Sequence, residues 1–351
     1  THVDAYFDRN IIMTRCFVEA SAWRRSSLLD YLAVGRTLHM KNPLDRLYAF
    51  LDMPTGEDYR IQVDPKYGDT VLEVYHDFAI RHIHATRGPR ILDYIVHRTQ
   101  SLQYSAPTWV PSWDYLERGP LREERFVALT SRTGSVPEPV LINRGLLRVR
   151  AVILGPVRFT TSTLDRSTIT FETLAKIWAA VQSQSHLVPC EGSYPLRMFL
   201  STLTRAHVSG DQWTWAELMT TYIACLETSY DLSDGGTHSE ADIDLSKVNT
   251  LIQRYANAKK FMLLERGYMG LGPAVTQEGD VYGIIFGCTT PCILRETSLQ
   301  HQYKFVGPCF VPGRQTLSYL DGHAVYPYLL GEEDSKDWLG WDVNEHDIYL
   351  C

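Results

Sequence analysis

The sequence predicts an α+β fold, with a helical N-terminal part, a central block of strand and helix, and a β-rich C-terminal part that forms a small barrel or curled sheet. Three observations support this prediction. Apolar residues recur at helical spacing in the first hundred residues, a stretch near residue 150 alternates between apolar and polar side chains, and short apolar runs fill the last third. With 351 residues, 44% of them hydrophobic, the chain is long enough to bury a substantial core.

The N-terminal part contains several amphipathic stretches. Residues 26–34 place apolar side chains at helical spacing behind a polar start. Thr70 and Glu73 have the spacing of a capping box, in which each side chain satisfies a free N–H group of the first helical turn. One apolar stripe follows it, formed by Val71, Val74, Tyr75, Phe78 and Ile83. We expect both helices to dock on a core.

From residue 88 to residue 114 the pattern changes to strand and loop. Pro107 and Pro111 exclude a helix and restrict the backbone around Trp109 and Trp113. We expect the two indoles to fill the core of a domain, with stacking on a ligand as the alternative.

The central block mixes strand and helix. Residues 146–154 alternate as a strand that Gly155 and Pro156 are expected to end, and residues 171–181 carry a helical apolar stripe. Thr214 and Glu217 form a second capping box. Residues 231–245, rich in aspartate, serine and glycine, predict an acidic loop, and residues 246–259 predict a last helix.

The C-terminal part is predicted to be β-rich. Short strands are expected at residues 261–264, 281–286, 292–295 and 303–306. The glycine-rich residues 267–273 lack the Lys-Ser/Thr ending of a phosphate-binding loop, so we expect a turn whose glycines adopt positive φ.

These patterns divide the chain into three expected regions. Residues 1–115 form a mainly helical region, residues 116–260 a mixed region with the acidic loop, and residues 261–351 the β-rich region.

Charge and cysteine content restrict the class of protein. A formal net charge of −7 argues against a general nucleic-acid or membrane-surface binder, although a local basic patch remains compatible with it. No apolar run approaches the length that spans a bilayer. The 7 cysteines are scattered and odd in number, which favours a reduced, intracellular and cytoplasmic protein.

Motifs for catalysis and metal binding are missing from the sequence. There is no Gly-x-Ser-x-Gly, His-Glu-x-x-His or Cys-x-x-Cys pattern. Cys288 and Cys292 have a spacing that zinc accepts, but no second pair follows, and His82 and His84 diverge on a helix. The acidic loop departs from the calcium-loop pattern. The sequence therefore predicts no catalytic residue, metal or cofactor, and favours a protein that is not an enzyme.

Four segments, taken in order, carry a family resemblance. They are residues 42–51 (NPLDRLYAFL), residues 63–79 (a Val-Asp-Pro-Lys-Tyr turn with its following helix), residues 108–113 (TWVPSW), and the glycine-rich residues 266–273 together with 279–280 and 305–307. We call them the landmark segments. Together they resemble the region of fungal heterokaryon-incompatibility (HET) proteins that follows the signature domain. Asn42, Leu44, Asp52, Thr108 and Ser112 depart from the family pattern.

The resemblance implies a role in fungal non-self recognition and programmed cell death. The two motifs that open and close the signature domain do not occur, so this chain is expected to be a fragment that begins after that domain. It would be a non-catalytic regulatory or interaction region whose partner is the missing N-terminal HET core or another incompatibility protein. The landmark positions are expected to be structural: Asp45, Arg46, Tyr48, Tyr67, Trp109, Pro111, Trp113, Gly267, Gly270 and Gly272.

Two alternatives remain. One is an enzyme of fungal metabolism with a pocket between the helical and β-rich parts, lined by Trp109, Trp113, Tyr268 and His323. The other is a gene fragment without an independent role.

Overall fold

The computed structural model of the chain describes residues 27–114 (except 54, 58, 66, 99, 104 and 105), 131–184, 187, 194–205, 222, 246–312 and 337–351. The capping box at Thr214, the acidic loop 231–245, three of the cysteines (Cys16, Cys190 and Cys225) and His323 lie outside these residues.

The N-terminal helices form as their caps predict. They are α3 (Leu28–Gly35), α4 (Asp45–Tyr48), α5 (Val71–Thr86) and the 3-10 helix η1 (Arg90–Tyr94). Ser27 caps α3 and Thr70 caps α5, each in a complete capping box. Val74, Tyr75 and Phe78 of the predicted stripe are buried. Both expected helices are confirmed.

Three further helices follow the first long strand. They are α6 (Phe171–Ser183), α7 (Tyr194–Leu203) and α9 (Ser246–Tyr255). The predicted stripe of α6 is confirmed, since Leu174, Ile177, Trp178 and Val181 are buried. The helix expected to reach residue 259 ends at Tyr255, and the chain enters a strand four residues later.

The strands belong to one curled sheet. They are β1 (Val140–Asn143), β2 (Leu146–Thr160), β3 (Lys259–Leu264), β4 (Met269–Pro273), β5 (Val281–Ile285), β6 (Cys292–Glu296), β7 (Gln302–Pro308) and β8 (Glu345–Leu350). Two 3-10 helices lie between them, η2 (Glu265–Gly267) and η4 (Asp337–Gly340). The order is β4-β3-β2-β5-β6-β7-β8, and β8 also pairs with β2, which closes a ring. All pairings are antiparallel except that of β7 with β8. The predicted α+β class with a curled C-terminal sheet is confirmed.

The predicted end of β2 is wrong. Gly155 and Pro156 lie inside the strand, where the pairing with β5 shifts register between Ile153 and Gly155. Gly155 adopts φ of +149°, and a side chain there would meet the carboxylate of Glu265. The irregularity bends β2, so that its first part pairs with β8 and β5 and its last part with β3.

The glycine-rich turn is only partly a turn. Gly267 has φ of +78° as expected, but Gly270 and Gly272 lie in β4. A side chain at either position would collide with Met262, which faces them from β3. Close packing, rather than a positive φ, is therefore what these two positions require.

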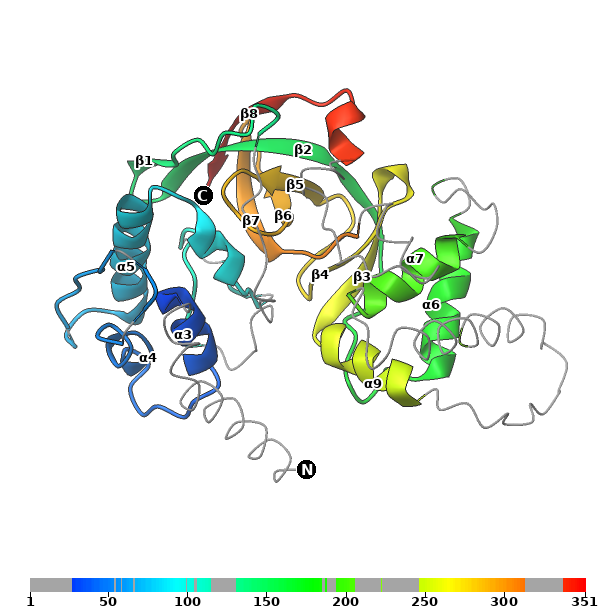
Figure 1. The fold of residues 1–351 in the computed structure, drawn as a ribbon, viewed down its shortest axis with the longest axis horizontal. Coiled ribbons are helices and arrows are strands. Elements are labelled where there is room, and N and C mark those ends of the chain that lie inside the picture. The colour runs from blue at the N-terminus through cyan, green and yellow to red at the C-terminus, as the bar shows by residue number, and fades with distance from the viewer. Residues whose placement is uncertain are drawn as a thin grey trace, which may run out of the picture.

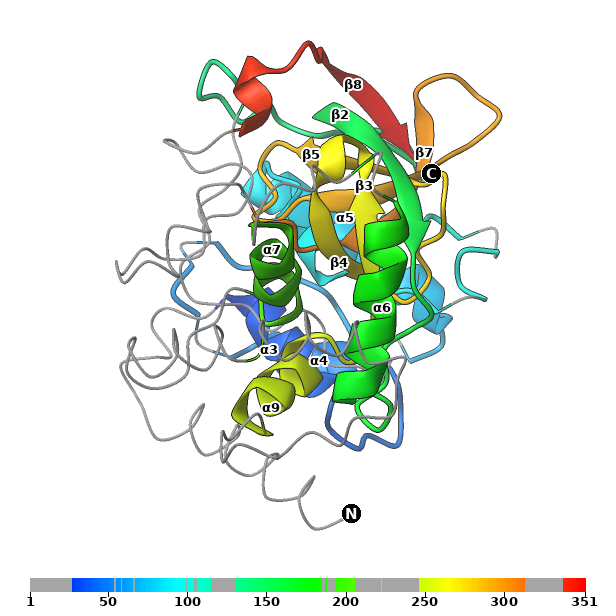
Figure 2. The same cartoon turned by 90° about the vertical axis from the view of Figure 1, so that its right-hand side faces the viewer.

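Three buried clusters organise the molecule around the sheet. On β3, Phe261 and Leu263 pack on α6, α7 and α9, while Met262 and Leu264 join a cluster with Tyr282 and Ile293 from β5 and β6. The third cluster joins the N-terminal helices to the opposite side of the sheet. Figure 1 shows the sheet between these two groups of helices. Figure 2 shows α6, α7 and α9 in front of β3 and β4.

Candidate functional site

The first two landmark segments meet on the surface of the N-terminal part. The Tyr67 hydroxyl donates to Asp45 Oδ1 at 2.9 Å, and the Tyr67 ring contacts Tyr48 edge-on. That hydrogen bond is the main cause that raises the pKa of Tyr67. Arg46 is buried, and its guanidinium donates to the carbonyl oxygens of Arg36 and Gly35 at the end of α3. These residues fasten α4 to its neighbours.

The third landmark segment is buried. Trp109 and Trp113 have no exposed surface, and Pro111 between them is also buried. The Trp109 indole N–H donates to the carbonyl oxygen of Gly145 at 3.2 Å. The guanidinium of Arg36 lies over the Trp113 ring, 4.6 Å from its centroid. Both indoles fill the core that joins the N-terminal helices to the sheet, as the sequence predicts.

Three of the four residues proposed as pocket liners lie in the described part of the chain, and they fall into separate cores. Trp109 and Trp113 belong to the cluster under the N-terminal helices, whereas Tyr268 belongs to the cluster lined by β3, β5 and β6 and contacts Trp341. Because His323 lies outside the described residues, the set of four stays a prediction.

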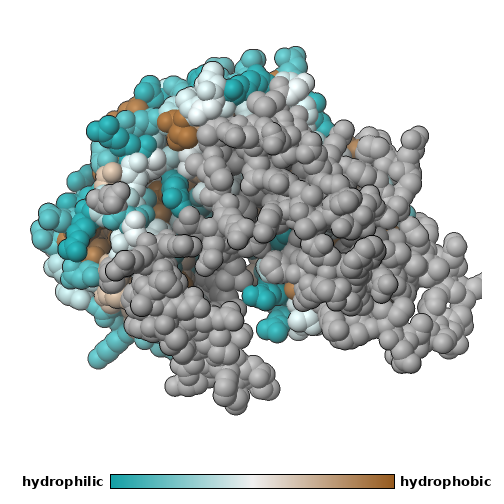
Figure 3. All heavy atoms as spheres, viewed as in Figure 1, coloured by the Kyte–Doolittle hydropathy of each residue, from teal (hydrophilic) through white to brown (hydrophobic). Residues whose placement is uncertain are grey.

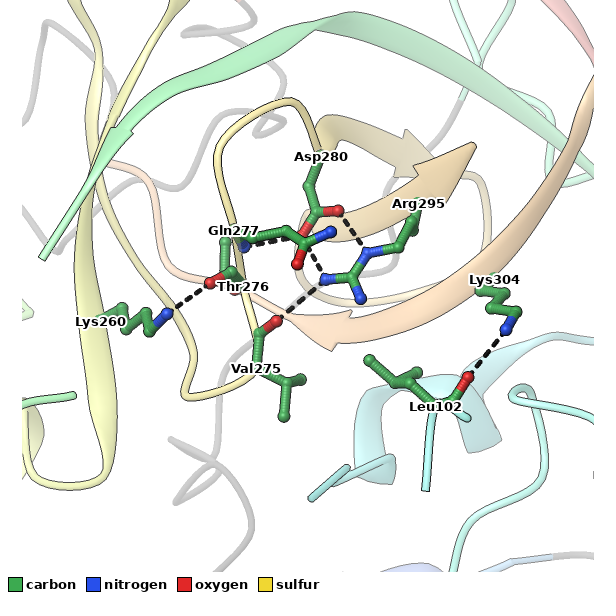
Figure 4. Close-up of polar contacts among 8 residues, drawn as sticks. All are labelled: Leu102, Lys260, Val275, Thr276, Gln277, Asp280, Arg295 and Lys304. Atoms are coloured by element: carbon green, nitrogen blue, oxygen red, sulfur yellow. Dashed lines mark hydrogen bonds and ion pairs between the residues drawn. The ribbon is translucent and has the colours of Figure 1, made fainter. Parts of the chain in front are cut away.

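A polar network lies at one end of the sheet, where β3 and β5 begin and β6 ends. It consists of Lys260, Asp280, Arg295 and Lys304 with the main chain that they contact, and we call it the barrel-end network. Along their strands, Lys260 and Lys304 alternate with side chains of the outer clusters, so they share the inner side with Met262 and Val306. Figure 4 shows Lys260 and Lys304 on either side of the Asp280–Arg295 pair.

Asp280 and Arg295 form the centre of this network. Arg295 donates from Nε and Nη2 to the two carboxylate oxygens of Asp280, at 2.7 and 2.9 Å. Asp280 is 2% exposed, so the bidentate pair is shielded from solvent on the carboxylate side. Nη2 also donates to the carbonyl oxygen of Val275, and the Gln277 N–H donates to Asp280. The pair therefore holds the connection between β4 and β5.

The two lysines of the network bind main chain. Lys260 Nζ donates to the carbonyl oxygen of Thr276 at 2.7 Å, and Lys304 Nζ donates to that of Leu102 at 2.8 Å. The first contact holds the β4–β5 connection, and the second holds a loop of the N-terminal part (Figure 4). The charged groups of both lysines therefore hold segments of the main chain in position. Sequence reasoning assigned no role to Lys304 or Arg295. The signal that could have identified them in the sequence is a charged residue at an inner position of an otherwise apolar strand.

A second set of polar contacts joins the N-terminal part to the sheet. Asp93 of η1 accepts hydrogen bonds from the Thr289 N–H, the Thr289 hydroxyl and the Thr290 hydroxyl. We call these three residues the joint. Burial raises the pKa of Asp93 to about 6, against the opposing effect of its hydrogen bonds and of Arg90.

Thr108 reinforces the same connection. Its main-chain N–H and its hydroxyl both donate to the Cys351 carbonyl oxygen, and the hydroxyl accepts from the Phe305 N–H at 2.8 Å. The Thr108 carbonyl oxygen lies 2.9 Å from Nε2 of His97. Burial lowers the pKa of His97 to about 4. Thr108, a departure from the family pattern, thus serves both the N-terminal part and the sheet.

Of the residues weighed as metal ligands, Cys288, Cys292 and His82 are buried, whereas His84 is exposed. Cys288 and Cys292 are free thiols whose pKa values burial raises, so neither is an activated nucleophile. His82 is buried, and burial lowers its pKa to about 3. Within the described ranges, no three histidine, cysteine, aspartate or glutamate side chains are grouped to hold a metal ion. None of the helices that the structure describes has the length and apolarity needed to cross a membrane.

Comparison with known protein families finds a β-barrel domain in the part of the chain that forms most of the curled sheet. A family model described as the Het-6 beta-barrel domain matches residues 210–318, which contain α9 and β3 to β7. No curated protein and no solved structure matches the chain. The match includes the fourth landmark segment and the barrel-end network, and it excludes the first three landmark segments. Residues 210–318 are therefore similar to a barrel domain associated with fungal heterokaryon incompatibility.

Proposed function

We propose that this chain is a regulatory and interaction region of a heterokaryon-incompatibility protein. It acts in fungal non-self recognition and cell-death signalling by restraining or positioning a HET signature domain, either its own or that of another incompatibility protein. The match to the Het-6 beta-barrel domain supports the biological setting.

The observation that carries the proposal is that landmark residues join the N-terminal helices to the sheet. Trp109 and Trp113 lie in a core that β2, β7 and β8 share with the N-terminal helices, and Asp93 and Thr108 hydrogen-bond across the same boundary. Residues that hold two parts of a molecule in a fixed relation are typical of a scaffold. A rigid scaffold can present one surface to a partner domain in a constant orientation.

Co-expression tests this function directly. The chain is produced in yeast together with a separately encoded HET signature domain, and growth and co-purification are measured. We expect the chain to co-purify with the signature domain and to change the growth arrest that this domain causes. A matched control carries Trp109→Ala and Trp113→Ala, which remove core side chains and should abolish both effects by unfolding the scaffold. Failure of the native chain to co-purify, with growth arrest unchanged, would overturn the proposal.

A further inference from the structure

Within the part of the chain that the structure describes, one edge of β1 has no partner strand. Among the described residues, β1 pairs with β2 alone, in the register Val140 to Arg148 and Leu141 to Leu147. Its other edge therefore presents main-chain N–H and C=O groups to which a further strand can pair. Pro137 and Pro139 precede β1 and lack N–H donors, so such pairing is confined to the short strand itself.

The outer side of β1 is apolar and exposed. Val140 and Ile142 are 37% and 47% exposed, while Leu141 points the other way and packs on the core under the N-terminal helices. Figure 1 shows β1, β2 and β8 together at the upper left and top of the molecule. In the same view, Figure 3 shows small hydrophobic patches within a mainly hydrophilic surface in this region.

Arginines of β2 lie beside these apolar side chains. Arg148 is paired with Val140 in the sheet and shares its side, and Arg150 follows two residues later. Both reach the single carboxylate of Asp347 on β8, at 3.8 and 3.5 Å, with 39% and 37% of their side chains exposed. Two long contacts to one exposed aspartate leave a local excess of positive charge on a chain whose net charge is −7. We call Val140, Ile142, Arg148 and Arg150 the β1 face.

We propose that the β1 face binds an extended acidic segment of a partner protein. The segment adds as a strand along the open edge of β1, places apolar side chains on Val140 and Ile142, and directs carboxylates at Arg148 and Arg150. Arginine and exposed aliphatic side chains together are typical of protein interfaces. A second copy of this chain fits less well, because symmetric pairing of two β1 strands would bring the arginines of both copies to one side. This inference rests on the proposed interaction function and names the surface that serves it.

Binding of short peptides tests the chemistry of the face. The probes are two labelled peptides of about eight residues with threonine at every second position. The remaining positions, which share one face of a strand, carry valine and glutamate in one peptide and valine and lysine in the other. We expect fluorescence anisotropy to show that the glutamate peptide binds and that added salt weakens it. The Arg148→Gln/Arg150→Gln variant and the Ile142→Glu variant should each weaken binding about tenfold or more. Equal binding of both peptides, no binding of the glutamate peptide, or unchanged binding by both variants would overturn the proposal.

Matched controls lie elsewhere on the same sheet. Leu299, in the turn between β6 and β7, is 64% exposed, so Leu299→Glu adds the same charge outside the face. Arg158, near the far end of β2, is 49% exposed, and Arg158→Gln removes an arginine there. Both controls should bind the glutamate peptide as the native chain does. Thermal unfolding of every variant would show that all of them remain folded.

The same variants separate this inference from the proposed function. If the signature domain co-purifies equally with the native chain and with Ile142→Glu, the interaction function stands and the β1 face is the wrong surface for it. If the glutamate peptide binds at the β1 face but the signature domain does not co-purify with the native chain, the face stands and its partner is another acidic protein.

Discussion

Two buried carboxylates hold this molecule together in different ways. Asp280, at the barrel end, accepts two parallel hydrogen bonds from the guanidinium of Arg295. Asp93, at the joint, accepts its hydrogen bonds from the neutral groups of Thr289 and Thr290. A partner of opposite charge compensates a carboxylate for the loss of water, whereas neutral donors compensate it only in part. The barrel end is therefore fixed by matched charges, whereas burial at the joint raises the pKa of Asp93.

The largest effect is expected from breaking the matched charges. Asp280→Ala leaves Arg295 without its carboxylate and the Gln277 N–H without its acceptor. We expect the free energy of unfolding, measured with urea, to fall by about 3–4 kcal/mol. The control is Asp347→Ala, which removes an exposed carboxylate that also contacts arginines and should lower it by less than about 1 kcal/mol. Equal losses would show that burial of the pair does not matter.

The pH dependence of the joint should come next in size. Because burial raises the pKa of Asp93 to about 6, the folded state binds its proton more tightly than the unfolded state does. Its contribution to stability is fully present below about pH 4 and is lost as the pH rises through 6. Relative to Asp93→Asn, the native chain should therefore lose roughly 2–3 kcal/mol of unfolding free energy between pH 4 and pH 7.

Taking the difference between the two proteins isolates Asp93 from other groups. His97 has a pKa lowered to about 4 by burial, so its contribution to stability rises with pH over the same range. That contribution is common to both proteins and cancels in the difference. Arg90, Cys288 and Cys292 face Asp93 and are likewise unchanged. A difference that stays constant from pH 4 to pH 7 would contradict the buried, shifted carboxylate.

A smaller loss of stability is expected where the ammonium group of a lysine donates to a main-chain carbonyl oxygen. Lys304 links the two regions, since it stands on β7 and donates to Leu102 of the N-terminal part. Lys304→Met keeps the aliphatic stem but removes the donor, and we expect a loss of about 1.5 kcal/mol in urea unfolding. Lys176→Met, which removes an exposed lysine paired with Glu172 on α6, should lower the stability by about 0.5 kcal/mol or less. A loss at Lys304 no larger than at Lys176 would show that this contact does not help to hold the N-terminal part on the sheet.

The sequence predicts the elements of the fold better than their contacts. Ser27 and Thr70 begin helices because their caps are local, and the predicted strands at β3, β5, β6 and β7 follow from short apolar runs. β4 was missed because its glycines suggested a turn. Their cause is Met262 of β3, which leaves no room for a side chain at these positions. β1 was missed because it is only four residues long, and β8 was missed because its exposed side carries polar residues.

The candidate sites were less predictable for the same reason. Asp93 accepts from residues 196 and 197 positions further along the chain, so nothing near Asp93 in the sequence indicates its partners. Arg295 and Asp280 are closer in sequence, but only the pairing of β5 with β6 brings them together. Local patterns specify caps and strand alternation, whereas the position of a buried charge depends on which strands become neighbours.

The smallest effect is expected at a third carboxylate, Asp45, which is only partly buried and bonds an exposed tyrosine. Asp45 accepts from the Tyr67 hydroxyl, and the Tyr67 side chain lies on the surface at 58% exposure. Water replaces this hydrogen bond when it is lost, so Tyr67→Phe should change the free energy of unfolding by about 0.5 kcal/mol or less. Tyr75→Phe is a matched change in a buried ring, where the hydroxyl donates to the Pro43 carbonyl oxygen, and it should lower the stability by about 1 kcal/mol. A larger loss at Tyr67 than at Tyr75 would mean that this landmark contact stabilises α4 more than its exposure indicates. Burial would then not determine how much each polar contact of this scaffold contributes to the free energy of unfolding.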